Sequence, residues 1–363
     1  CCRCRAWAIG EMKKRTGRSA WSVAGLGLGP QLWGVAGLGV GPQLWGVVGL
    51  GRMGNEFVNS IKETDNSQLV LVSSLDKRKL EIFSKNNNFN DEYLFNNYDS
   101  LINNDKVNSI YIATTNNTHL DLIKKCIKAK KNILCEKPIC LNLTETQEAK
   151  KLILENNIKF VEAIAYYSHP IYIELRKLID KKEIGDIVSI DTLFGFKVKK
   201  IDPSSRLFNK KLGGGVILDL GCYPISFLML FEKDTEKFII EKKKISYSST
   251  NVDDFAEATI NIKDEIKANI KISLKENLQN NCIIKGTKGQ IFIPSPWLPE
   301  KNSYLEVQSD KRSYKKFFDI GKSVYANQIY NVSKYFNNED VKNLFKIDFS
   351  LKCMKFLDRW IAQ

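Results

Sequence analysis

Short apolar runs and helical patterns alternate along the first half of the chain. The runs expected to form strands, rich in β-branched residues, are 44–48, 68–76, 109–113, 132–135 and 158–170. The segments expected to form helices, with apolar residues every three or four positions, are 55–61, 119–129 and 144–157. Asn117 or Thr118 is positioned to cap the second helix, and Thr144 and Gln147 have capping-box spacing in the third. Such alternation is typical of a doubly wound parallel sheet.

The pattern changes beyond Pro170. A helix is expected at 171–181, and the segments after it alternate polar and apolar residues, as in an antiparallel sheet with one exposed face. These segments are 184–196, 253–262, 265–274 and 280–293. The sequence therefore predicts an α/β domain followed by an α+β domain with a mostly antiparallel open sheet. Because an open sheet face commonly docks a partner subunit, we expect a homodimer or homotetramer that associates through this sheet.

A twelve-residue phrase occurs three times near the start of the chain, beginning at Trp21, Trp33 and Trp45. Only the third copy has the complete pattern G-x-G-x-x-G, because Pro30 and Pro42 hold the third glycine position in the other two. A period of twelve is shorter than the units of solenoid repeats. We interpret the repeat as a tandem duplication of the first strand and turn, which leaves residues 1–43 as a Gly/Trp-rich appendage without a clear role.

The third copy has the residues that bind the phosphates of a dinucleotide. After the first strand, Gly49 makes the tight turn, Gly51 lets the backbone approach the pyrophosphate, and Gly54 lets helix and strand pack closely. The helix N-terminus then presents free N–H groups to the phosphates. We therefore predict a Rossmann domain over 44–165 and a substrate-binding and oligomerisation domain over 166–363.

The second predicted strand ends in Asp76, 22 residues after Gly54. An acidic residue at this distance binds the ribose hydroxyls of NAD, whereas basic residues such as Lys77 and Arg78 can bind the 2′-phosphate of NADP. Alternatively, Asp76 only caps the helix that follows. The expected cofactor is NAD or NADP, with NAD favoured.

Composition and charge narrow the range of partners. The net charge is +14, but the lysines are dispersed and no nucleic-acid-binding motif accompanies them, so no nucleic-acid partner is expected. An anionic substrate would suit a basic protein. Six cysteines scattered among apolar residues indicate reduced core thiols in a cytoplasmic protein, and neither they nor Cys1, Cys2 and Cys4 have the spacing of a metal site. The six are Cys126, Cys135, Cys140, Cys222, Cys282 and Cys353.

The uncharged span 19–51 is long enough to cross a membrane. It contains ten glycines and two prolines, which suit a helix poorly, so no membrane partner is expected. A membrane-attached enzyme anchored by 19–44 is the alternative. The appendage joins the N-terminal end of the first strand, while the cofactor site lies at the C-terminal ends of the strands. We therefore expect the appendage to be tolerated.

Several further segments resemble the Gfo/Idh/MocA oxidoreductases. They include "VVGLGRMG", "CEKPI", "EIGDIVSI", "RLFNKKLGGGVILDLGCYPIS" and "IIKGTKGQIFI", and the resemblance covers nearly all of the chain after residue 44. The second half is most similar to the branch of dihydrodiol dehydrogenase, xylose dehydrogenase and glucose–fructose oxidoreductase. The resemblance implies NAD(P)-dependent hydride transfer at a carbon of a sugar, sugar derivative or cyclic diol.

The resemblance also implies roles for individual residues. Lys137 of "EKP" would be the catalytic lysine, acting with Asp219 and Tyr223, and Tyr167 and His169 would join the last two in binding substrate. The implied cofactor-binding residues are Gly49, Gly51, Arg52, Met53, Gly54, Asp76, Lys77, Arg78, Thr114, Thr115, Asn116, His119, Glu136 and Lys137.

The chemistry of these residue types agrees with the implied roles. A tyrosine hydroxyl has a pKa of about 10, too high for a good base at neutral pH, and a nearby ammonium favours the phenolate. Asp219 and Tyr223 are four apart and share one face of a helix. The three glycines 213–215 are expected to leave backbone N–H groups open to ligand, and Pro138 is a candidate for a cis peptide bond.

Each assignment has a structural alternative. An isolated lysine is usually a solvated surface residue, a tyrosine usually belongs to the core or its rim, and Asp219 alone fits a helix N-terminus. His119 at a helix start fits a structural role as well as a cofactor contact. The sequence departs from its relatives at Tyr167 and Leu75, where arginine is common. The rival function is a non-catalytic cofactor- or metabolite-sensing regulator on the same fold.

Overall fold

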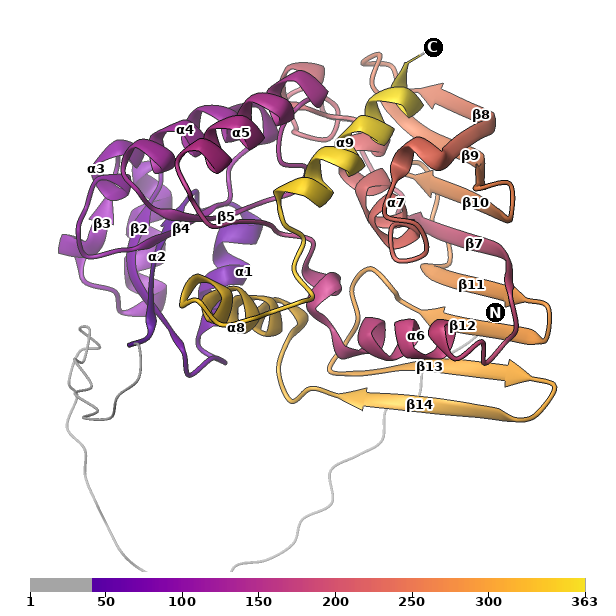
Figure 1. Cartoon of the computed structure of the whole chain (residues 1–363). Helices are drawn as coiled ribbons and strands as arrows, with labels where there is room; N and C mark the ends of the chain where they lie inside the picture. Colours follow the sequence, from indigo (N-terminus) through magenta and orange to yellow (C-terminus); the bar gives the residue numbers. More distant parts are fainter. Residues whose placement is uncertain (1–40, 363) are drawn as a thin grey trace, which may run out of the picture.

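The computed structural model describes residues 41–362, and within them the first sheet has the predicted parallel architecture (Figure 1). Its strand order is β3-β2-β1-β4-β5-β6. The strands are β1 (Gln43–Val48), β2 (Ser67–Ser73), β3 (Leu94–Phe95), β4 (Ser109–Ile112), β5 (Asn132–Cys135) and β6 (Phe160–Glu162). The helices between them are α1 (Arg52–Ile61), α2 (Lys77–Asn87), α3 (Tyr98–Ile102), α4 (His119–Lys128) and α5 (Leu143–Glu155). The order reverses between β1 and β4, which opens a crevice at the C-terminal ends of these two strands.

The second sheet is mostly antiparallel, as predicted, and has helices on one face only (Figure 1). Its order is β14-β13-β12-β11-β7-β10-β9-β8, and β7 and β10 are the one parallel pair of this sheet within the described residues. The strands are β7 (Ile187–Gly195), β8 (Phe238–Tyr247), β9 (Asp253–Ile262), β10 (Ile266–Ser273), β11 (Asn281–Gly286), β12 (Gly289–Pro294), β13 (Asn302–Ser309) and β14 (Ser313–Asp319). The remaining helices are α6 (Pro170–Asp180), α7 (Cys222–Leu228), α8 (Val324–Phe336) and α9 (Ile347–Ile361).

The last two helices return to the first sheet. Helix α8 packs beside α1 on one face of that sheet, while α3 and α4 cover the other face. Trp45, the tryptophan of the third repeat copy, is fully buried here and its indole N–H donates to Ser333 of α8 at 3.1 Å. The ring of Trp45 also meets Phe57 of α1 edge-on at 5.3 Å between centroids. The third copy is therefore part of the folded core.

Two local expectations were wrong, and a third was confirmed in part. Helix α5 begins one residue earlier than expected and is capped by Asn142, whose side chain accepts from the N–H of Glu145, so Thr144 and Gln147 form no capping box. The expected strand 158–170 is only three residues long, because the chain turns into a 3₁₀ helix at Ala165–Ser168. Thr118 is the N-cap residue of α4, as one of the two alternatives predicted, but its hydroxyl makes no cap bond and instead pairs with Thr114.

Two expectations concern the start of the chain. The appendage 1–43 and the anchor 19–44 lie almost wholly outside the described residues. Within residues 41–362, no helix combines the length and apolar character needed to span a bilayer.

Candidate active site

The glycine-rich turn after β1 fits the pyrophosphate of a dinucleotide. Gly49 has φ +102°, and a Cβ there would lie 2.7 Å from the carbonyl oxygen of Ala113 at the end of β4. A Cβ on Gly54 would lie 2.0 Å from the carbonyl oxygen of Gly49, whereas a Cβ on Gly51 would meet no atom closer than 3.9 Å. Two glycines therefore allow the backbone to close up, and the third leaves open space for a ligand to approach.

The N-terminus of α1 is free to bind an anion. No side chain among residues 41–362 caps the helix, and no acidic residue lies in its first turn. The first N–H groups, from Arg52 and Met53 onward, therefore lack side-chain acceptors at the positive end of the helix dipole. Arg52 is exposed beside them. These residues fit the predicted phosphate site.

Asp76 caps α2 in this structure. Its carboxylate accepts from the backbone N–H of Lys79 at 3.3 Å, and the side chain is exposed, as are Lys77 and Arg78. Leu75 before it is 65% exposed. The capping interpretation is therefore correct, while one carboxylate oxygen can cap a helix and the other can still accept from a ribose hydroxyl. The contact with ribose stays a prediction.

The residues after β4 mainly hold protein backbone in place. The side-chain amide of Asn116 donates to the carbonyl oxygen of Gly213 at 3.1 Å, which joins the two domains. His119 is fully buried, and its Nδ1 lies 3.0 Å from the carbonyl oxygen of Pro138. Burial lowers the pKa of His119, so its ring is neutral at pH 7 and donates to Pro138. This geometry favours the structural role for His119, whereas Thr114 and Thr115 remain partly exposed at the crevice.

The structure brings the three predicted catalytic residues together. Lys137 precedes Pro138 through a cis peptide bond, as the sequence suggested. The Lys137 ammonium donates to the Asp219 side chain at 3.1 Å and to its backbone carbonyl at 2.6 Å. The same ammonium lies 4.9 Å from the ring centroid of Tyr223. Asp219 lies in a π-helical turn, Ile217–Gly221, that leads directly into α7, so it and Tyr223 face the end of β5 together.

Charge pairing governs the protonation of this cluster. Burial opposes charge on Asp219, but the cations of Lys137 and Arg206 outweigh it and lower the pKa of Asp219 to about 2. Burial likewise opposes the ammonium of Lys137, yet the Asp219 carboxylate raises the Lys137 pKa above its usual value. Burial raises the pKa of Tyr223, and Lys137 offsets this only in part. We expected the ammonium to favour the phenolate, but in this structure Tyr223 holds its proton.

Glu136 faces the interior of the first domain. Its carboxylate accepts from the hydroxyl of Tyr111 at 2.5 Å, and Tyr111 stacks on Phe57 of α1 at 4.3 Å between ring centroids. Burial raises the pKa of Glu136 despite that hydrogen bond and the charge of Lys137. Glu136 thus links the end of β5 to α1, and its predicted contact with the cofactor is not tested by these bonds.

The glycines at 213–215 do not leave their N–H groups open, contrary to our expectation. These groups donate to the carbonyl oxygens of Lys210, Asn209 and Leu207 at 3.0–3.1 Å. A Cβ on Gly215, which has φ +125°, would lie 2.2 Å from the carboxylate of Asp253. The glycines therefore permit close packing of a folded turn before the Asp219 segment.

Tyr167 and His169 point into packed regions. Tyr167 is buried against Phe345 and meets it edge-on at 5.4 Å between centroids. His169 is also buried, and its Nδ1 accepts from the N–H of Ile171 at 3.2 Å while its ring lies 6.4 Å from that of Phe318. No bond among the described residues joins either side chain to Lys137 or Tyr223, so their substrate contacts stay predictions.

An aromatic wall around Tyr223 was missed by the sequence analysis. The hydroxyl of Tyr166 donates to the backbone carbonyl of Tyr223 at 3.1 Å. The ring of Phe194 meets Tyr223 edge-on at 5.2 Å, and that of Trp297 lies 6.4 Å away. These residues come from four distant segments, so no local motif marks them.

Two charged residues at the site were also missed. Arg206 donates through Nη1 to Asp219 Oδ1 at 2.8 Å, so Asp219 binds two cations through one oxygen. Glu162 at the end of β6 is buried and accepts from the N–H of Ile139 at 3.0 Å, which fixes the loop that carries Lys137. The resemblance had already marked the segment that begins with Arg206, but no role had been assigned to it.

Glu162 predicts a pH dependence of stability. Burial raises its pKa from 4.5 to about 7. A raised pKa means that the stabilising contribution is complete below about pH 4.5, is lost as the pH rises from there to about 7, and totals about 3 kcal/mol. We expect Glu162→Gln, which stays neutral, to show a smaller fall in Tm between pH 4.5 and pH 7.5 than the wild type. Glu155→Gln on the exposed end of α5 is the control. An unchanged fall in the Glu162 variant would contradict the raised pKa.

The fold and site define a two-domain oxidoreductase with a Rossmann dinucleotide site, and comparison with known proteins agrees. The model of an oxidoreductase family with an NAD-binding Rossmann fold matches residues 44–164, and that of the GFO/IDH/MocA C-terminal domain matches residues 172–292. Two trans-1,2-dihydrobenzene-1,2-diol dehydrogenases are similar in sequence. That of Xenopus tropicalis is 31% identical over 253 residues, 69% of this chain and 74% of the relative. That of Mus musculus is 29% identical over 267 residues, 73% of this chain and 77% of the relative. The chain belongs to the Gfo/Idh/MocA oxidoreductase family.

Solved structures share the fold. A 3-ketoreductase from Actinomadura kijaniata, in complex with NADP and TDP-benzene, superposes with a TM-score of 0.77 at 17% identity, covering 87% of this chain and 96% of its own. An aldose-aldose oxidoreductase from Caulobacter crescentus, complexed with glycerol, gives a TM-score of 0.78 at 18% identity, covering 88% and 96%.

Proposed function

We propose that this enzyme transfers a hydride between a nicotinamide cofactor and an alcohol carbon of a sugar, sugar derivative or cyclic diol. The observation that carries the proposal is the position of Lys137. Its ammonium lies 3.1 Å from Asp219 Oδ1 and 4.9 Å from the Tyr223 ring, at the carboxyl end of β5, two strands along the sheet from the strand that leads into the glycine-rich turn. A site that moves a proton on and off an alcohol oxygen requires such groups in reach of one another.

The protein residues handle the oxygen and its proton. A nicotinamide bound in the crevice would supply or accept the hydride. Lys137 and Tyr223 both hold their protons in this structure, so both can donate hydrogen bonds to a carbonyl oxygen, and Tyr223 can pass its proton to the developing alkoxide. In the reverse direction the phenolate accepts the proton, and the Lys137 charge stabilises it. Asp219 holds Lys137 in position and can accept from a substrate hydroxyl.

The relatives support this class of substrate. The similar curated proteins are named dehydrogenases of a cyclic diol. The structural neighbours are named a 3-ketoreductase and an aldose-aldose oxidoreductase. Diols, ketosugars and aldoses all present an oxygen whose carbon exchanges a hydride.

Cofactor binding tests the proposal first. We expect purified protein to bind NADH at least about fivefold more tightly than NADPH in a fluorescence titration, because Asp76 is acidic and Leu75 offers no charge to a 2′-phosphate. Asp76→Ser, which keeps a hydroxyl to cap α2, should reduce that preference. Tighter binding of NADPH would instead assign Lys77 and Arg78 to a 2′-phosphate. Binding of neither cofactor would overturn the proposed function.

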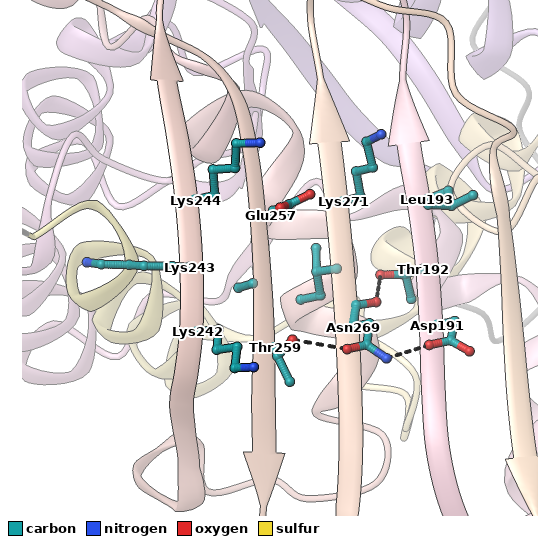
Figure 2. A pocket seen from close by; sticks show the side chains of 12 residues that line it. Asp191, Thr192, Leu193, Lys242, Lys243, Lys244, Glu257, Thr259, Asn269 and Lys271 are labelled. Atoms are coloured by element: carbon teal, nitrogen blue, oxygen red, sulfur yellow. Dashed lines mark hydrogen bonds between the residues drawn. The ribbon is translucent and has the colours of Figure 1, made fainter.

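We also propose that the chain forms a homo-oligomer through the open face of the second sheet. Figure 2 shows part of this face, where side chains from β7 to β10 line a shallow depression. Thr259 donates to Asn269, and Asn269 donates to Asp191 at 2.7 Å, while Lys243 turns to the other face and donates to the carbonyl of Trp360.

The half of the open face nearer β14 is more apolar. Ile283 pairs with Phe292 across β11 and β12, and Tyr304 lies 5.3 Å from Phe317, which is 66% exposed. Apolar side chains of this size on an open sheet suit burial against a second copy. Size-exclusion chromatography of the full-length protein with light-scattering detection should give a molar mass of two or four chains. A molar mass of one chain would contradict the proposal.

The cysteines support a cytoplasmic location. The six in the described residues are free and buried. Free buried thiols are usual in a reducing compartment.

A further inference from the structure

The segment between β7 and the turn at 213–215 is the most basic stretch beside the site. Residues 197–211 contain six basic residues against one acid, Asp202. The basic residues are Lys197, Lys199, Lys200, Arg206, Lys210 and Lys211. All are exposed, and apart from Arg206 none forms an ion pair with any residue in the described range 41–362. The carboxylate of Asp202 accepts instead from Ser204.

This segment contacts the first domain at its C-terminal end. The 3₁₀ turn Lys210–Leu212 contacts the turn Asn116–Thr118 that follows β4. The side chain of Asn116 donates to the carbonyl oxygen of Gly213, which closes the contact. Since β4 borders the cofactor crevice, the C-terminal end of the basic segment lies at the edge of that crevice.

Arg206 is held rigidly within the segment. Phe208 beside it is buried, and the N–H of Gly215 donates to the carbonyl oxygen of Leu207 at 3.1 Å. The Nη1 of Arg206 donates to Asp219 Oδ1, and within the described residues the Arg206 guanidinium donates to no other acceptor. The side chain is 42% exposed, so a ligand can reach it from solvent.

Two cations share one carboxylate at the centre of the site. Lys137 and Arg206 both bind Asp219 Oδ1, so this bonded group of three side chains carries a net positive charge. Within the described residues, the carboxyl of Glu136 forms an ion pair with neither cation and accepts instead from Tyr111. Arg206 is the more exposed of the two cations and places the positive charge toward the cleft. Such a cleft attracts an anion, and a planar guanidinium with free donors binds phosphate or carboxylate in a bidentate manner.

We propose that the substrate carries an anionic group, phosphate or carboxylate, which Arg206 and the lysines of 197–211 recognise. This inference rests on the proposed function, because it names the substrate class of the same site. The reacting alcohol carbon lies at Lys137 and Tyr223, and the anionic group lies toward Arg206. The enzyme then prefers sugars that carry a phosphate or a carboxylate over the corresponding neutral sugars.

Matched substrates test the proposal. The full-length protein with bound NADH is titrated calorimetrically with glucose, glucose 6-phosphate and glucuronate, and the same three forms of several aldoses are assayed for turnover. We expect at least a tenfold preference for one anionic form over the neutral parent, in both binding and kcat/KM. The preference should shrink at 0.5 M salt, because screening weakens the attraction. Preference for the phosphorylated form identifies a phosphate, and preference for the uronate identifies a carboxylate.

Variants distinguish recognition by the basic segment 197–211 from attraction by the net positive charge of the whole protein. Lys199→Gln with Lys200→Gln, and Arg206→Lys, should each reduce the preference three- to tenfold. Lys85→Gln with Lys128→Gln removes two exposed charges at the far ends of α2 and α4 and should leave it unchanged. Equal binding of neutral and anionic forms would overturn this inference even if turnover is observed. Anion-selective binding without any turnover would support it and would overturn the proposed function instead.

Discussion

Lys137→Met is expected to lower kcat by about 10³-fold, because it removes the ammonium that stabilises the oxyanion and the Tyr223 phenolate. Methionine has a similar length and fills the same partly buried space. The Asp219 carboxylate keeps its 2.8 Å bond to Arg206, so no buried charge is left without a partner. The fold should therefore survive, and the measurement is steady-state turnover together with the Kd for NADH.

Turnover and the Kd for NADH together distinguish a catalytic role of Lys137 from a structural one. We expect Kd for NADH to change less than about threefold, since the glycine-rich turn and α1 are untouched. Lys128→Met, on the exposed end of α4, is the matched control and should behave like the wild type. Turnover near the wild-type rate in Lys137→Met would remove the lysine from the mechanism, and loss of cofactor binding would make its role structural.

Local patterns were sufficient for the elements that build the cofactor site. The glycines at 49, 51 and 54 predict a dinucleotide-binding turn because a buried strand precedes them and a helix follows. The order of strands and helices then dictates a parallel sheet. The sequence pattern therefore predicted the fold class of both parts of the chain, and the family resemblance implied that Lys137 and Asp219 act together. These two residues, 82 positions apart, meet because each lies at the end of an element whose position the fold fixes.

Other features depend on contacts that no short pattern records. Arg206 reaches Asp219 from an irregular segment, and Glu162 reaches Ile139 across neighbouring strands, so neither has a periodic signal. The N–H groups of the glycines at 213–215 looked free in sequence because their acceptors lie in a preceding turn without regular structure. The capping box was displaced because Asn142, a better N-cap than threonine, lies two residues before Thr144. In each case a tertiary or neighbouring contact overrode a correct local preference.

Substitutions at Gly54, in the third copy of the repeated phrase, are expected to have the second large effect on stability and cofactor binding. The first two copies have proline where the third has Gly54. In the third copy any Cβ at this position would lie 2.0 Å from the carbonyl oxygen of Gly49, a backbone atom that cannot move without opening the turn. Gly54→Ala should therefore lower Tm and weaken NADH binding at least about 100-fold, and Gly54→Pro should do so more strongly because proline also removes an N–H at the helix start.

Gly51→Ala is the matched comparison, because its Cβ would meet no protein atom closer than 3.9 Å. We expect the wild-type Tm and about tenfold weaker NADH binding, since the methyl group would occupy space that only the cofactor needs. The two alanine variants thus separate a glycine required by the fold from one required by the ligand. If Gly54→Ala bound NADH normally, the third copy would not be the phosphate site. If it failed while Gly51→Ala kept its fold, the proline in each of the first two copies would explain why neither can replace the third.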